Sequence, residues 1–414
     1  MSKINNLIKE LCPNGVEFKS LKVVFDIFSG MTGVTNKWAE EGNCQFIDYM
    51  NAYKNNKINV NKVPYATVKN MNQITLIQGD LLLTSASEVP DECAIASVIE
   101  DKIKDGIFMD DHLFGLRLKG EYKNKINTTF ISYYLNSTPF RRNLFKAVRG
   151  VTRFYISNKD YMKLNVPIPP IKVQEEIVRI LDKFGELEAE LEAELEERKS
   201  QYEFWREKLL NDNNLVTIGD LLENKGYIRG PFGSALVKAD MVSEGIPVYE
   251  QQHAIYNHRD FRYFITLDKA KKLERFSIKP NDLIISCSGT VGRVSVISDN
   301  DPKGIINQAL LILRLNKKLI MPKYMKYYLE SPVGYRSITS NTNKSAQVNI
   351  ANREAIEKIK ISVPSLEQQK HIVNILDKFD ALVNDISEGL PAEIELRRKQ
   401  YEYYRNKLLS FEEL

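Results

Sequence analysis

Apolar residues recur at steps of three and four positions in two long segments of the chain, from Pro169 to Leu210 and from Pro364 to Leu409. The positions are Ile177, Ile180, Phe184, Leu187 and Leu191 in the first segment, and Ile372, Ile375, Phe379, Leu382 and Ile386 in the second. Residues at this spacing return to the same side of an α-helix. The pattern therefore predicts two long helices, each with one apolar face.

The two segments also share their letters. Both contain ILDKF, and RKSQYEFWREKLL near the end of the first corresponds to RRKQYEYYRNKLL in the second. A helix of about 40 residues is roughly 60 Å long, and an apolar face of that length needs a partner along it. The other copy can supply this partner, so we expect the helices to pack as an antiparallel coiled coil. The alternative, two unrelated surface helices, does not account for the shared strings.

The second segment contains four additional residues, within SEGLPAEI from Ser387. A glycine followed closely by a proline commonly ends one helix and starts the next. We therefore expect a break near Gly389–Pro391, with Gly389 as the C-terminal cap and Pro391 at the first position of a new helix.

The rest of the chain alternates short apolar runs with turn residues, which predicts strand-rich globular bodies. The bodies are related, since GDLLLTSAS corresponds to NDLIISCSG and YYLNSTPFRR to YYLESPVGYR. The repeat unit is thus one body followed by one helix. We expect an α+β protein with a pseudo-twofold internal repeat that brings the two chain ends together, divided into 1–165 (body), 166–211 (central helix), 212–362 (body) and 363–414 (distal helix).

Composition adds a few constraints. The chain has 414 residues, enough for two or three domains, and a formal net charge of +4. Seven glutamates lie between 186 and 197, so the remainder is more basic than the total and compatible with phosphate binding. The cysteines, Cys12, Cys44, Cys93 and Cys287, form no CxxC pair, so we expect reduced thiols. With no long apolar run and a polar start, MSKINN, a cytoplasmic location is expected.

Motifs for catalysis are scarce. The GxxxxGK(S/T) phosphate loop, HExxH and the (N/D)PP(Y/F) motif of amino-methylating enzymes are absent. Pro90, Asp91, Glu100 and Lys102 do follow the PD...(D/E)xK pattern of nucleases, in which two carboxylates hold Mg²⁺. The pattern is short, lies in a charged loop-like stretch and has no counterpart in the second body. We therefore predict no catalytic residue and no metal site.

The duplicated helix with ILDKF and QYE strings, preceded each time by a body with a GDLL or NDLI strand, resembles the specificity subunit of type I restriction-modification systems. SEGLPAEIELRRKQYEYYRNKLL is especially similar to the distal region of that family, and the resemblance covers the whole chain. It implies a DNA-binding subunit without catalysis of its own. Two target recognition domains would each recognise one half of a bipartite, asymmetric site, and the two helices would separate them and set the spacer.

The resemblance also implies partners. These are double-stranded DNA, two methyltransferase subunits docked on the helices, and restriction or translocase subunits. S-adenosylmethionine, ATP and Mg²⁺ would be bound by the partners, and no cofactor by this chain. The candidate residues for partner contact are Tyr202, Trp205, Arg206, Tyr401, Tyr404 and Arg405, although their aromatic members could equally belong to the coiled-coil seam.

Base recognition requires side chains that make paired hydrogen bonds to groove edges, and phosphate contacts require Arg, Lys or backbone N–H groups. Such residues occupy matching positions just before each long helix. They are Arg149, Gly150, Thr152, Arg153 and Tyr155 in the first body, and Asn343, Lys344, Ser345, Gln347 and Asn349 in the second. Secondary candidates are Arg229, Phe232, Ser234, Gln251, Gln252 and His253. Gln347 and Asn349 could instead cap the following helix or close a turn.

Two other functions remain open at this point. One is an enzyme, a nuclease or methylase fused to a recognition domain, which would cleave or methylate DNA unaided. The other is a coiled-coil scaffold with ligand-binding lobes, which would lack salt-dependent, sequence-selective DNA binding.

Overall fold

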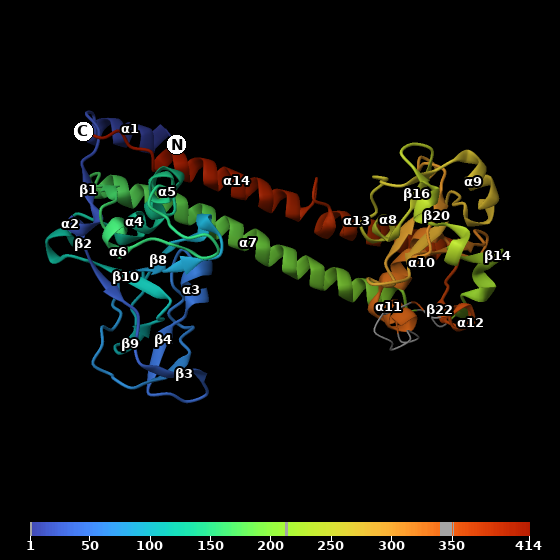
Figure 1. Ribbon diagram of the computed structural model, residues 1–414, viewed down its shortest axis with the longest axis horizontal. Helices are drawn as coiled ribbons and strands as arrows, with labels where there is room; N and C mark the ends of the chain where they lie inside the picture. Colours follow the sequence, from blue (N-terminus) through green and yellow to red (C-terminus); the bar gives the residue numbers. More distant parts are fainter. Residues whose placement is uncertain (1, 212–213, 340–349, 351) are drawn as a thin grey trace. The chain divides into compact units, whose positions relative to one another are not determined.

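The structure is a computed structural model of residues 1–414 and describes all of them except 1, 212–213, 340–349 and 351 (Figure 1). The chain forms two compact units. Unit 1 consists of Met1–Glu190 and Ile394–Leu414, and unit 2 of Leu191–Glu393. Each predicted body therefore lies within one unit. Among the described residues, no helix combines the length and apolar composition needed to cross a membrane.

Unit 1 is built on two four-stranded sheets, in the orders β2-β10-β6-β8 and β3-β5-β4-β9, and a small pair, β1-β12. A further pair, β11-β7, lies next to the candidate site. The strands are β1 Phe18–Ser20, β2 Phe25–Ser29, β3 Val34–Ala39, β4 Cys44–Ile47, β5 Tyr65–Val68, β6 Leu81–Thr84, β7 Ala86–Ser87, β8 Ala96–Val98, β9 Ile107–Met109, β10 Leu113–Leu118, β11 Phe154–Tyr155 and β12 Asn165–Pro167. The helices are α1 Ser2–Leu11, α2 Leu21–Val24, α3 Tyr49–Lys54, α4 Thr128–Leu135, α5 Thr138–Phe145 and α6 Asn158–Tyr161.

Unit 2 repeats this topology with sheets β14-β21-β18-β19 and β15-β17-β16-β20 and the pair β13-β22. Its strands are β13 Leu215–Thr217, β14 Leu222–Arg229, β15 Met241–Val242, β16 Ile246–Tyr249, β17 Phe264–Ile265, β18 Leu283–Ser286, β19 Val294–Val296, β20 Ile305–Ile306, β21 Leu310–Leu315 and β22 Lys360–Ser362. Its helices are α8 Gln251–Ile255, α9 Leu267–Lys272, α10 Pro322–Glu330, α11 Pro332–Thr339, α12 Arg353–Glu357 and α13 Leu366–Asn384. The internal repeat predicted from the faint sequence similarity of the bodies is confirmed.

An equivalent buried ion pair in each unit connects one strand of a four-stranded sheet with the residue that precedes the neighbouring strand. In unit 1, Arg117 on β10 donates to both carboxylate oxygens of Asp80, at 2.8 and 2.6 Å, and to the Thr75 carbonyl. In unit 2, Arg314 on β21 makes the same bidentate contact with Asp282, at 2.8 and 2.7 Å. Because both carboxylates are almost fully buried, the paired arginine is what makes their burial tolerable.

The long helices α7, Ile171–Leu209, and α14, Leu390–Leu408, each contribute residues to both units. A buried glutamine ties each body to its helix. Gln174 of α7 accepts from the Asn127 N–H and donates to the carbonyls of Lys125 and Pro169. Gln369 of α13 makes the equivalent three bonds in unit 2. Each amide thereby satisfies three backbone groups that the body would otherwise bury unpaired.

Within unit 1, α7 and α14 run antiparallel, as predicted. Phe184 of α7 stacks on Tyr404 with ring centroids 5.5 Å apart, and Glu188, one turn later, pairs with Arg398, at 2.6 Å. Higher numbers on one helix thus meet lower numbers on the other. Unit 2 has a seam of its own, where Tyr202 of α7 stacks on Phe379 of α13 at 6.1 Å.

The predicted apolar face needs correction. Leu187 and Leu382 are more than one-third exposed, and Ile386 lies beyond the end of α13 and is 85% exposed. The fully buried apolar residues of the first helix are Val173, Ile177 and Leu181, which pack into the core of unit 1. The reason is that each helix buries its first half against a globular body, and not only against the other helix.

The distal helix is interrupted, although not as the glycine and proline suggested. The first part, α13, ends at Asn384, and α14 begins at Leu390. The cap is Asp385, whose carboxylate accepts from the hydroxyl and N–H of Ser387 and from the N–H of Glu388. The hydrogen bond from the Ser387 hydroxyl, followed by those from the backbone, lowers the pKa of Asp385. Gly389 is thus the residue before α14, and Pro391 its second residue. An Asx turn, which a short carboxylate side chain forms readily, ends the helix before the glycine.

The two chain ends lie together in unit 1 (Figure 1). The Val16 N–H donates to Glu412, at 2.8 Å, and the Leu414 N–H donates to Val16, at 3.2 Å. Leu408 and Leu409 are buried in the same core as Ile4 of α1. This confirms that the repeat brings the ends of the chain together.

Replacing Gln174 or Gln369 by Ala should lower the free energy of unfolding by about 2–4 kcal/mol, because three buried backbone groups lose their partners. Urea denaturation of the full chain measures this. The control is Lys370→Ala, an exposed neighbour on α13, which should change stability by less than about 0.5 kcal/mol. A loss below that of the control for either glutamine would show that the amide does not anchor the body.

Candidate nucleic-acid interface

The first body presents the predicted residues on a hairpin that ends just before α6. Arg149 and Tyr155 exchange both backbone hydrogen bonds, each 2.9 Å long, and β11 extends the hairpin by pairing with β7. The turn between them needs Gly150, whose φ is +114° and where a Cβ would lie 2.0 Å from the Arg153 carbonyl oxygen. The structure therefore brings Arg149, Thr152, Arg153 and Tyr155 together on one exposed element.

The side chains of this hairpin face solvent. Val151 at the tip is 89% exposed and Tyr155 is 48% exposed. The guanidinium of Arg149 lies 3.2 Å from the carboxylate of Asp160. Hydrogen bonds from Lys163 and Ser157, followed by the charge of Arg149, lower the pKa of Asp160. An exposed turn with two arginines, an aromatic ring and an apolar tip suits contact with a phosphate backbone and a groove.

Tyr49 contacts β7, the strand that pairs with the hairpin, and no sequence pattern identified it as a site residue. Its hydroxyl donates to the carbonyl of Ala86 on β7, at 3.4 Å, and its ring stacks on Tyr53. Burial raises the pKa of Tyr49, so the hydroxyl stays a donor at neutral pH. Only the pairing of β7 with β11, a tertiary contact, connects this residue with the candidate site.

In the second body, Arg229, Phe232 and Gln251 gather around the turn after β18. Arg229 lies over the ring of Phe232, at 5.6 Å, and Phe232 is 62% exposed. The amide nitrogen of Gln251 lies 3.4 Å from where a Cβ on Gly289 would stand. Ser234 is exposed in the adjacent turn Gly233–Ala235. These secondary candidates therefore form one surface.

Arg229 is held beside Cys287. Its Nη1 is buried and has no hydrogen-bond partner among the described residues. Burial raises the pKa of Cys287 to about 12, although the neighbouring guanidinium acts in the opposite direction. All four cysteines are free thiols, and three of them are buried. The expectation of reduced thiols agrees with this arrangement.

The outcome is different for His253 and for the five predicted residues between 343 and 349. His253 is fully buried: its Nδ1 accepts from the Glu250 N–H at 2.7 Å, and burial lowers its pKa. Its prediction as a DNA contact is therefore wrong, because hydrogen bonds within the body already use the ring. The predicted set Asn343, Lys344, Ser345, Gln347 and Asn349 lies outside the described residues, and its role stays a prediction.

The nuclease-like group is built into the scaffold of unit 1. The Asp91 carbonyl accepts from Arg141, and Glu100 binds Lys57, at 2.6 Å, and the Thr129 hydroxyl. A separate group, Asp110, Asp111 and His112, has ligand atoms close enough for a cation. Lys37 pairs with both aspartates, so its ammonium group already supplies the positive charge that a bound cation would bring.

The predicted partner residues lie in or beside the helix seams. Tyr202 is buried against Phe379 and Tyr404 stacks on Phe184, while Arg206 and Arg405 lie over Tyr202 and Tyr401, at 5.0 and 5.4 Å. The seam role is thus confirmed for the tyrosines. Trp205 differs, because it is 39% exposed and carries Lys208 over its ring, at 5.0 Å. Contact of these six residues with a partner stays a prediction.

The chain matches the family described as "Type I restriction modification DNA specificity domain" twice, over residues 13–197 and 211–396. A putative type I restriction enzyme specificity subunit from Haemophilus influenzae is 32% identical over 302 residues, which cover 70% of this chain and 74% of the relative. A type I restriction enzyme specificity subunit from Escherichia coli is 33% identical over 304 residues, covering 70% and 72%. The crystal structure of the type I restriction-modification S subunit from M. genitalium has a similar fold, with a TM-score of 0.51 at 14% identity over 96% of this chain and 97% of that chain.

Replacing Gly150 by Ala should loosen the hairpin, because the added Cβ would meet the Arg153 carbonyl and the φ is unfavourable for alanine. We expect the amides of Arg149 and Tyr155 to exchange with solvent about tenfold faster, as measured by hydrogen exchange. Gly185→Ala on α7, where nothing lies within 4 Å of the added Cβ, is the matched control. Unchanged exchange in the Gly150 variant would contradict the proposed role of this turn.

Proposed function

The chain belongs to the type I restriction-modification DNA specificity family, and from this premise we propose that each of its two bodies recognises one half of an interrupted, asymmetric DNA site. The chain is the DNA-recognition subunit of such a system and not itself the enzyme. One observation carries the division into half-sites. Two bodies with the same topology carry different side chains at the ends of corresponding strands: Arg229 and Phe232 at the end of β14, but Ser29 and Thr32 at the end of β2.

The scaffold contacts are the same in both bodies, whereas the exposed residues are not. The pairs Arg117–Asp80 and Arg314–Asp282 are equivalent, as are the anchors Gln174 and Gln369. By contrast, Arg229 and Phe232 at the end of β14 correspond to Ser29 and Thr32 at the end of β2. Because base edges are recognised by the side chains that reach them, such bodies would select different sequences.

The proposal assigns the chemistry to partner subunits. S-adenosylmethionine, ATP and Mg²⁺ would be bound by methyltransferase and restriction subunits, and the assembled complex would act in the cytoplasm. Glu100 of the nuclease-like group supports this division of labour, since its carboxylate already has Lys57 and Thr129 as partners. The enzyme alternative gains no support from that group.

A duplicated aromatic surface supports docking of two methyltransferase subunits. On α7, Phe204 is 60% exposed and lies beside Trp205, with Lys208 over both rings. On α14, Tyr403 is likewise 60% exposed, with Lys407 over its ring at 5.8 Å. Large aromatic side chains with an adjacent cation are typical of binding hot spots. The same surface in both repeats favours two copies of one partner.

The recognition proposal is tested by exchanging residues 1–165 for those of a relative with another specificity. Only one half of the methylated site should change when the complex is expressed and its methylated adenines are mapped across the genome, because each body binds its half-site separately. The reciprocal exchange of residues 212–362 is the control and should change the other half. A change in both halves after a single exchange would contradict the assignment of one body to one half-site.

The docking proposal is tested with Phe204→Ala and Tyr403→Ala. Each variant should weaken one of two partner sites by about 2 kcal/mol, roughly 30-fold, because an aromatic anchor is lost. Native mass spectrometry should then show one bound methyltransferase subunit for each single variant and none for the double variant. Leu396→Ala, an exposed apolar residue elsewhere on α14, is the control. Two bound subunits in the double variant at unchanged affinity would rule out this surface.

A further inference from the structure

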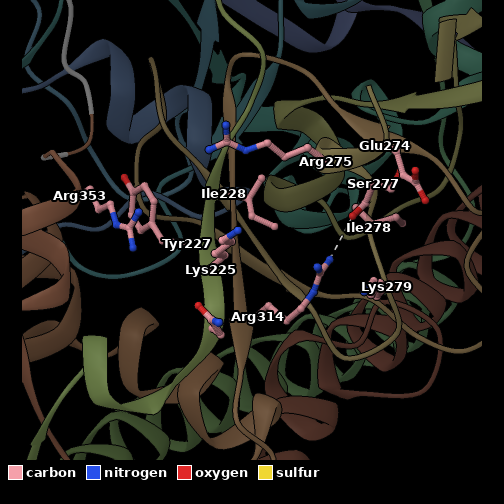
Figure 2. A pocket seen from close by; sticks show the side chains of 11 residues that line it. Lys225, Tyr227, Ile228, Glu274, Arg275, Ser277, Ile278, Lys279, Arg314 and Arg353 are labelled. Atoms are coloured by element: carbon pink, nitrogen blue, oxygen red, sulfur yellow. Dashed lines mark hydrogen bonds between the residues drawn. The ribbon is translucent and has the colours of Figure 1, made fainter. Parts of the chain in front are cut away.

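A basic cavity of about 810 Å³ opens in unit 2, on the side of β14 (Figure 2). Its floor is formed by Tyr227 and Ile228, which are buried. Its remaining lining is Asn224, Lys225, Glu274, Arg275, Ser277, Ile278, Lys279, Arg314 and Arg353. Five cations and one acid therefore line the cavity.

Two of the five cations are neutralised within the body. Arg314 makes the bidentate pair with Asp282 and donates to the Ser277 carbonyl, as the dashed line in Figure 2 shows. Arg353 pairs with Glu357 at 2.7 Å and lies over the ring of Tyr227. The other three, Lys225, Arg275 and Lys279, form no ion pair with any residue that the structure describes. The cavity thus holds uncompensated positive charge.

An insertion in β14 builds one wall of this cavity. The four residues 223–226 lie between two β14 positions whose partners on β21 are only two residues apart. At the corresponding place in unit 1, Asp26 alone fills the interval on β2. The bulge holds Lys225 at a φ of +60°, a conformation that costs free energy for a residue with a side chain. Bulges of this kind commonly redirect a side chain toward a ligand.

Unit 1 has the same scaffold without these charges. Thr75 and Ser277 occupy equivalent positions in the two units, because their carbonyls accept hydrogen bonds from the equivalent residues Arg117 and Arg314. Counting from them, Gln73 replaces Arg275, and Ile77 replaces Lys279. Asp26, at the place of the bulge, is even acidic. Since the fold is maintained without the cations in unit 1, they are not needed to stabilise the body of unit 2.

We propose that the three uncompensated cations of this cavity bind neighbouring phosphodiester groups of the DNA backbone, so that the second body contributes more of the electrostatic affinity for DNA than the first. The inference rests on the proposed function and goes beyond it by making the two bodies unequal. Tyr227 connects the cavity with the candidate interface, because Arg353 lies over its ring and Arg229 is two residues further along β14.

The form of the cavity favours the DNA backbone over a small phosphorylated ligand. The three uncompensated cations are all exposed, at the rim and on long side chains. A site for a small anion would bury converging donors, whereas contacts with a duplex phosphate are made by exposed Lys and Arg side chains. A second cavity shares Lys279 and Arg314 and adds Lys317 together with Glu223, so it adds no net positive charge to the surface.

The test variant combines Arg275→Gln with Lys279→Ile, the side chains that unit 1 carries at these positions. It is measured in the complex with its methyltransferase subunits, on duplex DNA containing the mapped site. Each phosphate contact contributes about 0.9 to the slope of log Kd against log salt concentration, so the slope should fall by about 1.8. Raising the salt concentration from 50 to 200 mM lowers the affinity of both proteins for DNA. The factor by which it falls should be about 12 times smaller for the variant than for the unmodified complex. Lys225→Asn, a residue that tolerates positive φ, should lower the slope by about 0.9.

Lys271→Gln with Lys272→Gln is the matched control, because it removes two exposed charges nearby on α9 that do not line the cavity. A smaller change of slope in this control supports the cavity, and an equal change would overturn it. An unchanged slope in the cavity variant, with selective binding by the unmodified complex, would also overturn the inference while leaving the proposed function in place. Absence of selective binding by the unmodified complex would instead reject the proposed function.

Inorganic phosphate provides the second arm. At constant ionic strength and without DNA, phosphate should bind the unmodified complex no more tightly than it binds the complex with the cavity variant. Binding with a Kd below about 1 mM that the variant loses would assign the cavity to a free phosphorylated ligand and contradict the DNA assignment.

Discussion

The structure depends on the burial of apolar helix faces that the helices cannot cover alone. The core of unit 1 combines Val173, Ile177 and Leu181 of α7 with Leu408 and Leu409 from the other end of the chain. The core of unit 2 likewise combines Tyr202 of α7 with Ile372 and Leu376 of α13. Removing such surface from water stabilises a fold by about 25 cal/mol per Å², which makes the helices part of each core and not external attachments.

This arrangement explains why the polar anchors are repeated. A body that packs on a helix must satisfy its own backbone groups at the contact, and a buried amide does so with one acceptor and two donors. Gln174 and Gln369 provide these bonds at equivalent places, and Tyr133 and Tyr327 bond to Asp182 and Asp377 on the same helices. Burial, followed by the aspartate hydrogen bond, raises the pKa of both tyrosines, so they stay protonated donors.

The exposed surfaces are under different constraints. Where the scaffold does not depend on a side chain, the two halves differ: Arg229 and Phe232 at the end of β14 in unit 2 correspond to Ser29 and Thr32 at the end of β2 in unit 1. Recognition of two unlike half-sites requires this divergence, because each base pair offers its own pattern of donors and acceptors. The basic cavity extends the difference from base recognition to phosphate binding.

The sequence alone determined the long helices, their antiparallel pairing, the internal repeat and the family, because periodicity and repeated strings are local or chain-internal signals. It also located Arg149 and Arg153 on one element. Only the tertiary structure decided which helix residues are buried, since Leu187 is exposed while Val173 packs against a body. It alone showed that Asp385 ends α13, that His253 is inside the fold, and that Arg275, Lys279 and Lys225 line one cavity. The burial of His253 and the cavity join residues far apart in the chain, and so they form only when the sheets pack. The Asp385 turn is local, but it depends on hydrogen bonds that no periodicity records.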